Sequence, residues 1–473
     1  MIDFVFINSF LSGPFIQQNL NNQSIDLKNI NNVKTLKNIS KDFENISNAE
    51  DAENITTIEI DELKDTTNIN DLEDIKNVNN GEKFLTYLPH SRFSNQLTSL
   101  KNAIILSYIT NRTLIIPPIV FAKIPYSSQT LYKTLNESAT IKKARILCST
   151  NHTKYCKDKY HSYDSFSLMN WSNLFDFTFV KKHVRVINRG YDFNFQTLEK
   201  FLNITTNDTY YLLEKIRYEF QYFDTDDTNL EVGYRYQKKY FISNLKSRPE
   251  TLIHLVSTFG LERLVLEQRQ NIDLYYGLHA NFKFGHMALK ECVKKIVEEL
   301  GRRKSFIGIH IRVGDGDFKS IQFKEQLIDS VLNRLVSETK EWLDNPYADS
   351  KEYPNVMKDN YYLQNNSKTL LNSKCLESKK SPVIYIASDS KNPKQNFKKI
   401  YSNFNPCVFT LSDFKKYLEP LRDLYNDFDN HSLYSLFIPF VDMLVVSNGG
   451  IFIGTVNSTF SRVARDIHDF QQF

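Results

Sequence analysis

An arginine follows an apolar run in the stretch Ile307-Gly-Ile-His-Ile-Arg-Val-Gly-Asp315. The run predicts a buried strand, and Arg312 stands at its carboxyl end, where open α/β sheets bind ligands. The planar guanidinium group of arginine matches a pair of phosphate oxygens. Arg312 is therefore a candidate anion-binding residue. An ion pair with Asp315 or Asp317 is the alternative explanation.

Small hydroxylated residues join an expected strand to an expected helix in Phe452-Ile-Gly-Thr-Val-Asn-Ser-Thr-Phe-Ser461. Ser458 and Thr459 fall where that helix begins, and the free N–H groups and positive dipole end of a helix N-terminus favour a phosphate. Ordinary helix capping explains the same residues equally well. Asn457 begins a glycosylation sequon, which a buried phosphate cradle would leave unmodified.

A third strand ends in polar residues at Val383-Ile-Tyr-Ile-Ala-Ser-Asp389. Asp389 is a candidate contact for a ribose or a base. We favour a different role for this residue, as the N-cap of the helix that follows.

The first expected strand is followed by a polar loop that carries His90, Arg92, Asn95 and Gln96. Four such residues together favour a functional loop that faces a ligand. The chain has no Gly-rich dinucleotide fingerprint and no Walker loop. It also lacks a Gly-X-Ser-X-Gly motif, so a serine hydrolase is disfavoured. Zinc-type cysteine pairs are absent too, and we expect no metal site.

The elements that position these residues alternate between strand and helix, which predicts an α/β protein with parallel, doubly wound sheets. Strands are expected at 83–88, 113–116, 306–311, 383–387, 407–411 and 451–454, and helices at 95–108, 286–300, 323–343, 394–401, 433–447 and 459–470. We expect one domain over 81–300 and a second over 301–473, with a ligand cleft between the carboxyl ends of their strands. Residues 1–80 are Asn-rich with no sustained period, which predicts a disordered stem.

Composition restricts the partners and the compartment. The net charge of the 473 residues is only +4, with no clustered basic stripe, so we expect no nucleic-acid partner. The sequence contains no run of about eighteen apolar residues, so it predicts no transmembrane helix. Thirteen Asn-X-Ser/Thr sequons favour a secretory lumen, but residues 1–13 make no convincing signal peptide. Either the true start of the chain is missing or the protein is not secretory.

Five cysteines allow two disulfides and one spare thiol. Cys148 with Cys156 would close a short loop, and Cys375 with Cys407 a longer one. Free thiols are equally compatible with the count.

Taken in order, these stretches resemble the protein O-fucosyltransferase superfamily, particularly its fungal-like members. Residues 87–96 with 111–118 resemble its N-terminal motif, 307–315 its arginine motif, and 384–389 and 452–461 its two C-terminal motifs. The resemblance implies a GT-B fold of two Rossmann-like domains with a cleft between them. It also implies GDP-fucose as the donor, inversion at the anomeric carbon, no required metal, and a place in the endoplasmic reticulum or Golgi lumen.

The resemblance also implies roles for single residues. Arg312 would grip the β-phosphate and stabilise the charge on the departing GDP, and Asn95, with Arg92 beside it, would line the junction of donor and acceptor. The other residues that would contact the donor are His310, Asp389, Asp442, Ser458, Thr459 and Phe460.

One departure concerns the base that activates the acceptor. Some family members carry a glutamate in the first loop, whereas residues 92–96 of this chain, Arg-Phe-Ser-Asn-Gln, hold no carboxylate. Either the fucosyl bond ionises early and needs little base help, or another acid such as Asp315 or Asp317 serves. The acceptor is expected to be a protein or a glycan. The alternative functions are transfer from another sugar nucleotide and inactive binding of a sugar nucleotide or glycan.

Overall fold

The computed structural model describes residues 81–121, 131–132, 135–136, 139, 166–314, 316–344, 375 and 382–470. The expected disordered stem at 1–80 lies outside the described residues.

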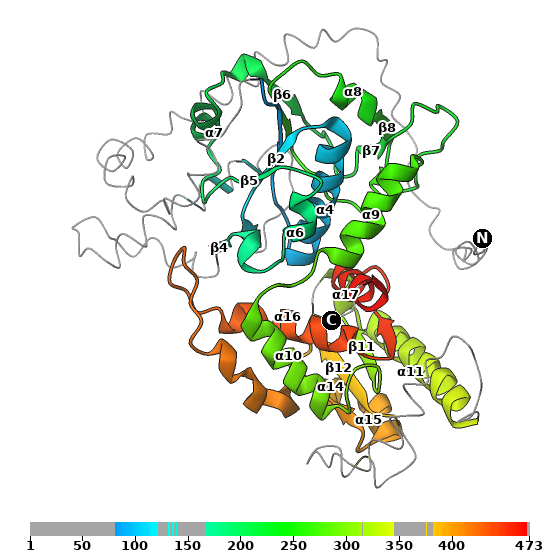
Figure 1. Cartoon of the computed structure of the whole chain (residues 1–473). Helices are drawn as coiled ribbons and strands as arrows, with labels where there is room; N and C mark the ends of the chain where they lie inside the picture. The colour runs from blue at the N-terminus through cyan, green and yellow to red at the C-terminus, as the bar shows by residue number, and fades with distance from the viewer. Residues whose placement is uncertain are drawn as a thin grey trace. The chain divides into compact units, whose positions relative to one another are not determined.

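A five-stranded parallel sheet is built from the first part of the described chain (Figure 1). Its strands, in the spatial order β5-β2-β1-β9-β6, are β5 (Val186–Asn188), β2 (Thr113–Ile116), β1 (Phe84–Tyr87), β9 (Leu252–Leu255) and β6 (Thr209–Leu212). The central strands are buried along their whole length. Nearly continuous apolar runs such as Thr-Leu-Ile-Ile in β2 suit a parallel sheet, because both of its faces are covered.

Helix α4 (Phe93–Thr110) follows β1 and packs against β1 and β2. It ends at Asn111, whose left-handed backbone (φ 52°) closes the helix, a conformation that asparagine tolerates. The further elements up to residue 281 are α6 (Thr178–Lys181), α7 (Phe195–Leu202), α8 (Ile242–Lys246), α9 (Arg269–Asn281), a sheet of β7 (Phe220–Phe223), β8 (Lys238–Phe241) and β10 (Leu264–Val265), and the antiparallel pair β3 (Ile119–Val120) and β4 (Leu168–Met169).

A second parallel sheet has the order β13-β12-β11-β14. Its strands are β13 (Val408–Phe409), β12 (Ile384–Ser388), β11 (Ile307–Ile311) and β14 (Ile451–Gly454). Helix α16 (Tyr434–Ser447) packs on β11 and β12. The approach is closest at Gly308, where a Cβ atom would collide with the backbone carbonyl of Val446.

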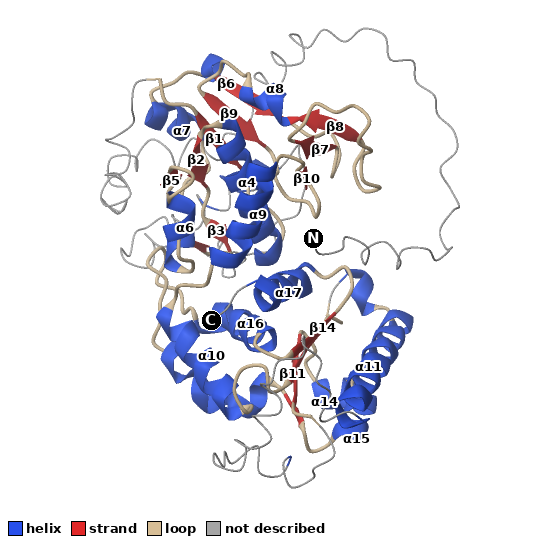
Figure 2. Cartoon of the chain, turned by 45° about the vertical axis from the view of Figure 1, so that its right-hand side comes forward, coloured by secondary structure: helices blue, strands red, loops and turns tan. Residues whose placement is uncertain are grey.

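The remaining helices surround this four-stranded sheet (Figure 2). They are α10 (Met287–Glu299), α11 (Ile321–Asp344), α14 (Pro393–Asn396), α15 (Lys398–Phe404) and α17 (Thr459–Phe470), with 3₁₀ segments at Gly316–Lys319 and Leu411–Leu421. Helix α17 contacts β14 and α16, and it also contacts α4 and α9.

The prediction of an α/β protein with Rossmann-like parallel sheets is confirmed. One sheet takes all its strands from 84–255 and the other from 307–454. The division into domains at 81–300 and 301–473 stays a prediction, because α17 packs against helices of both parts.

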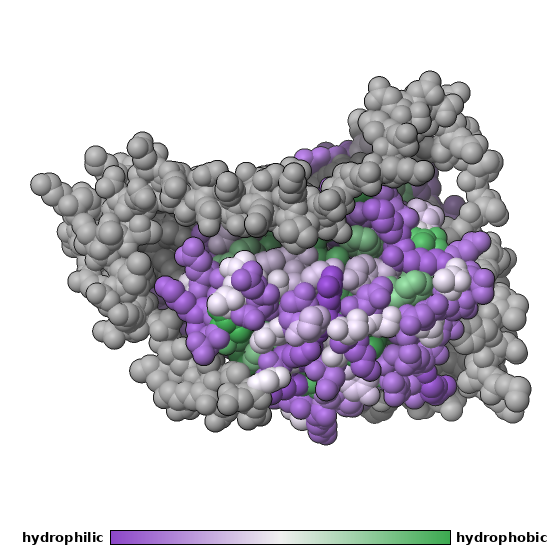
Figure 3. Space-filling model, turned by 90° about the horizontal axis from the view of Figure 1, so that it is seen from above, coloured by the Kyte–Doolittle hydropathy of each residue, from purple (hydrophilic) through white to green (hydrophobic). Residues whose placement is uncertain are grey.

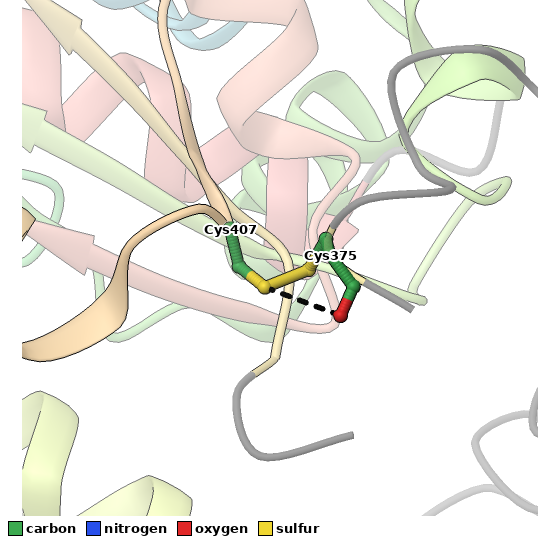
Figure 4. The surroundings of a disulfide bond; sticks show 2 residues. All are labelled: Cys375 and Cys407. Atoms are coloured by element: carbon green, nitrogen blue, oxygen red, sulfur yellow. Dashed lines mark hydrogen bonds between the residues drawn. A yellow bond between two sulfur atoms is a disulfide. The ribbon is translucent and has the colours of Figure 1, made fainter. Parts of the chain in front are cut away.

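A disulfide joins Cys375 and Cys407, as one of the two expected pairings requires (Figure 4). Cys407 directly precedes β13, so the bond attaches Cys375 to this edge of the four-stranded sheet. Cys292, on α10, is a buried free thiol. The pairing expected for Cys148 and Cys156 lies outside the described residues.

The described surface is mainly hydrophilic in the view of Figure 3, with apolar residues scattered over it. Among the helices of the described chain, none combines the length and the apolar character that a membrane span needs.

Candidate functional site

Arg312 directly follows β11, and its backbone is held on one side by the residue that follows the neighbouring strand β14. Its N–H donates to Oγ1 of Thr455, at 3.0 Å, and the same hydroxyl donates to the carbonyl of His310, at 2.9 Å. Thr455 directly follows β14, the neighbour of β11, and is 2% exposed. The threonine side chain thus joins the ends of two adjacent strands.

Asp389 holds the same turn from the other side. Its two carboxylate oxygens accept hydrogen bonds from the N–H groups of Val313, at 2.8 Å, and Gly314, at 2.9 Å. Ser388 adds a hydrogen bond from its hydroxyl to the carbonyl of Ile311, at 2.6 Å. The favoured role of Asp389 as a helix N-cap is wrong, because α14 begins after Asn392 and has no side-chain cap.

The guanidinium carbon of Arg312 lies 4.9 Å from the ring centroid of Phe318, a distance suited to a cation–π contact. Arg312 is half-buried, and its backbone is fixed by β12 and β14 together. The side chains of Asp315 and Asp317, the expected alternative partners, lie outside the described residues.

His310 supports the start of α17. Its Nδ1 atom is 2.6 Å from the hydroxyl of Ser461, and its ring stacks on Phe460 with centroids 4.3 Å apart. Burial, reinforced by the positive charge of Arg312, lowers the pKa of His310 to about 3. His310 is therefore neutral at physiological pH and positions Phe460 and Ser461 without adding positive charge.

The first turn of α17 is capped by Ser458, whose hydroxyl accepts a hydrogen bond from the N–H of Ser461, at 3.4 Å. Ser458 is buried, whereas Thr459 and Phe460 are partly exposed. The capping expected as the alternative explanation is thus present. It satisfies one of the free N–H groups at this helix end and leaves others available to an anion.

Asn457 is exposed, and its side-chain oxygen accepts a hydrogen bond from Nη2 of Arg235, at 3.2 Å. Asn457 itself is therefore not buried, and a phosphate cradle at Ser458 and Thr459 stays a prediction. Asn457 adopts a left-handed conformation (φ 62°) that turns the chain into α17.

Asp442 lies on α16 and accepts a hydrogen bond from the hydroxyl of Tyr385, at 2.6 Å. Burial raises the pKa of Asp442 to about 7, although the hydrogen bond from Tyr385 acts in the opposite direction. Tyr385 is fully buried and belongs to β12. A contact of Asp442 with a nucleoside stays a prediction.

The polar loop after β1 divides into buried and exposed residues. The two ring nitrogens of His90 lie 2.9 Å from the hydroxyl of Ser91 and 2.7 Å from that of Ser257. Burial, and then the charges of Arg263 and Arg217, lower the pKa of His90 to about 3. His90 therefore has a structural role in this loop.

Gln96 is also structural, because its side-chain amide pairs with the backbone N–H and carbonyl of Val120, at 2.9 and 2.8 Å. Arg92 is exposed directly before α4, and Asn95 is half-buried in the first turn of that helix. A role of Arg92 and Asn95 at the site stays a prediction.

The structure brings together the ends of β11, β12 and β14, which carry His310, Arg312 and Asp389, with the start of α17. Sequence reasoning missed Thr455 and Ser388. A threonine or serine at a strand end is unremarkable in sequence, and only the register of β11 with its neighbours shows the contacts.

Within the described part of the chain, no group of three or more His, Cys, Asp or Glu side chains is arranged to hold a metal ion.

Comparison with known proteins gives a family match over most of the chain. The family model described as GDP-fucose protein O-fucosyltransferase matches residues 152–471. The match excludes residues 87–118, so it leaves the likeness of the first loop untested.

Similarity to individual proteins is more limited. O-fucosyltransferase 30 of Arabidopsis thaliana is 65% identical over 40 residues, which are 8% of this chain and 8% of that protein. POFUT1 in complex with GDP is 12% identical over 81% of this chain and 94% of its own, with a TM-score of 0.36. Fucosyltransferase NodZ from Bradyrhizobium is 16% identical over 81% of this chain and 93% of its own, also with a TM-score of 0.36. Similarity at this level places no individual residue.

Proposed function

Because the chain belongs to the GDP-fucose protein O-fucosyltransferase family, and is thus a glycosyltransferase, we propose that it transfers fucose from GDP-fucose to a hydroxyl group of a protein or glycan. The single observation that carries the proposal is the fixed backbone of Arg312, held by Thr455 on one side and by Asp389 on the other. An arginine anchored in this way can present its charge to a diphosphate with little reorganisation.

The donor is proposed to bind at the ends of β11 and β14. Arg312 contacts the β-phosphate and stabilises the negative charge that develops on GDP as it leaves. Backbone N–H groups at Thr459 and Phe460 donate hydrogen bonds to phosphate oxygens at the positive end of α17. His310 keeps Phe460 in place by stacking. In this arrangement the protein itself supplies the positive charge, so the reaction is proposed to need no metal ion.

Transfer is proposed to invert the anomeric carbon. The acceptor oxygen attacks from the face opposite the diphosphate, the bond from the anomeric carbon to the β-phosphate oxygen breaks, and GDP departs with the electron pair. A base takes the acceptor proton. His90 and His310 are unsuited to this task, because each is buried and has a pKa near 3. Asp315 and Asp317 remain the candidates.

We further propose that the protein works in the lumen of the endoplasmic reticulum or Golgi. The disulfide between Cys375 and Cys407 supports an oxidising compartment, since disulfides persist there and are rare in the cytosol. The sequons of the chain agree with this assignment.

The test is a binding screen with purified protein, in which GDP, GDP-fucose, GDP-mannose and UDP-sugars are compared by thermal shift with and without a chelator. We expect stabilisation by GDP and GDP-fucose in both conditions. Arg312→Ala should weaken GDP binding and slow GDP release from GDP-fucose, while Arg334→Ala, on the exposed part of α11, should change neither. An Arg312→Ala protein with the binding and release of the wild type would contradict the mechanism.

The absence of a carboxylate from residues 92–96 favours one second candidate, a protein that binds the sugar nucleotide without transferring the sugar. GDP-fucose binding with no release of GDP under any condition would favour it.

A further inference from the structure

Charged side chains are buried where α17 meets α4 and α9 (Figures 1 and 2). Nζ of Lys101, on α4, lies 3.7 Å from a carboxylate oxygen of Asp466, on α17. Nε2 of His279, on α9, lies 3.5 Å from the same oxygen. Lys101 is only 7% exposed and His279 only 5%. Three helices that are far apart in the chain therefore meet at one carboxylate.

A buried lysine is rare, because the loss of water around an ammonium group is costly unless a partner compensates it. Asp466 is that partner for Lys101, and burial lowers the pKa of His279 to about 3, so the histidine is neutral. Removal of Asp466 would leave the buried charge of Lys101 uncompensated, whereas removal of Lys101 would leave Asp466, whose side chain is 21% exposed, with the positive charge of Arg462. The pair therefore couples α4 to α17 more firmly than an exposed ion pair would.

The two helices carry the two halves of the proposed active site. Asn95 lies in the first turn of α4 and Lys101 six residues further on, whereas α17 begins at Thr459 and Asp466 is seven residues further on. At about 1.5 Å per residue, Lys101 lies about 9 Å along α4 from Asn95, and Asp466 lies about 10.5 Å along α17 from Thr459. The ion pair therefore lies at nearly the same distance along each helix from the site residue of that helix.

We propose that Lys101 and Asp466 are positioning residues that set the distance between the acceptor side of the site, at Asn95, and the donor side, at the start of α17. The inference rests on the proposed function and deepens it, because it assigns a role to residues that touch neither substrate. GDP contacts the donor side, so its affinity depends little on the pair. Reaction at the fucosyl carbon needs both sides, so its rate depends on the pair strongly.

The experiment replaces both charges with apolar side chains of similar size, Lys101→Met with Asp466→Leu, since loss of a whole buried pair is tolerated better than loss of one partner. The control is Lys295→Met with Glu291→Gln, which removes an exposed ion pair on α10. The conservative variant Lys101→Arg, which keeps the charge, should behave like the wild type. The measurements are GDP affinity by calorimetry, GDP release from GDP-fucose with water as the acceptor, and amide hydrogen exchange.

We expect the double variant to keep GDP affinity within about threefold of the wild type, and its GDP release to fall about tenfold or more. Exchange should accelerate around Lys101 in α4 and around Asp466 in α17, and it should stay unchanged in α10. A folded double variant with wild-type release and exchange would overturn the proposal, as would a loss of affinity that matches the loss of release. If wild-type protein failed to bind GDP, the proposed function would fall, and hydrogen exchange would still decide whether the pair holds the two helices.

Discussion

The carboxylate of Asp389 holds the backbone of Gly314, with 2.9 Å between Oδ2 and the amide nitrogen, although the two residues belong to different strand ends. The second oxygen of the same carboxylate holds Val313. The carboxylate shapes the turn that presents Arg312, and its contact with a ribose or a base stays a prediction.

Asp389→Asn should impair the arginine turn and leave the fold intact. The amide keeps one acceptor oxygen and places an NH₂ group against the other backbone N–H, so the turn loses one charge-assisted hydrogen bond. We expect GDP affinity to fall about tenfold to a hundredfold. Calorimetry with GDP would measure it, with Asp329→Asn on the exposed face of α11 as the control. Unchanged affinity would show that the turn does not need this carboxylate.

Thr455→Val should destabilise the protein, because it removes the hydroxyl that accepts from the N–H of Arg312 and donates to the carbonyl of His310. Valine has nearly the same shape, so the loss reports the hydrogen bonds. The free energy of unfolding should fall by about 1–3 kcal/mol in denaturant titrations. Thr455→Ser keeps the hydroxyl and should retain most of the stability. Equal losses in both variants would contradict the assignment.

Alanine substitutions at Gly308 and Gly314 should have different consequences. At Gly308 the new Cβ would meet the backbone carbonyl of Val446, which cannot move away, whereas at Gly314 it would meet the side chain of Asp389, which can rotate. Gly308→Ala should lower stability by about 1–3 kcal/mol. Gly314→Ala should spare stability and reduce GDP affinity, since it displaces Asp389 from the turn. Thermal unfolding and calorimetry would separate the two effects.

Asp442→Asn should change how stability depends on pH. Burial raises the pKa of Asp442 to about 7 in the folded protein, from the ordinary value of 3.8. The folded state therefore binds the proton more tightly, and this stabilising contribution is present at low pH and lost as the pH rises through 7. Asparagine does not titrate, so from pH 5 to pH 8 the variant should gain about 2 kcal/mol relative to the wild type.

Denaturant titrations at pH 5 and pH 8 would measure the change, and GDP affinity of the same protein would test the predicted nucleoside contact. A constant difference in stability between the two proteins at both pH values would contradict the raised pKa. Unaltered GDP affinity would remove Asp442 from the donor site.

Much of the fold was predictable from the chain itself. Runs such as Ile307–Ile311 and Ile384–Ser388 are mainly apolar and are followed by polar residues. That pattern identifies buried parallel strands, because both of their faces are covered. The same pattern predicts that Arg312 lies at the end of a strand.

Hydrogen-bond partners were not predictable in the same way. Asp389 stands shortly before a helix in the sequence, which suggested a local cap, but the pairing of Ile311 with Ser388 brings it beside Gly314. His90 and Gln96 were expected around a polar loop that faces a ligand, and both are buried, with hydrogen bonds to residues distant in the chain. A local pattern reports whether a side chain is polar, and it contains no information about which distant backbone will lie beside it.

The sequence by itself therefore determined the α/β class, the strands of the second sheet and the position of Arg312, because these depend on the periodicity of apolar residues and on local breaks. Only the tertiary structure decided what surrounds the arginine and how α4 and α17 are coupled. Thr455, Asp389 and the buried pair of Lys101 with Asp466 all act across strands or helices that are far apart in sequence. Their partners are set by the register of the sheet and the packing of the helices.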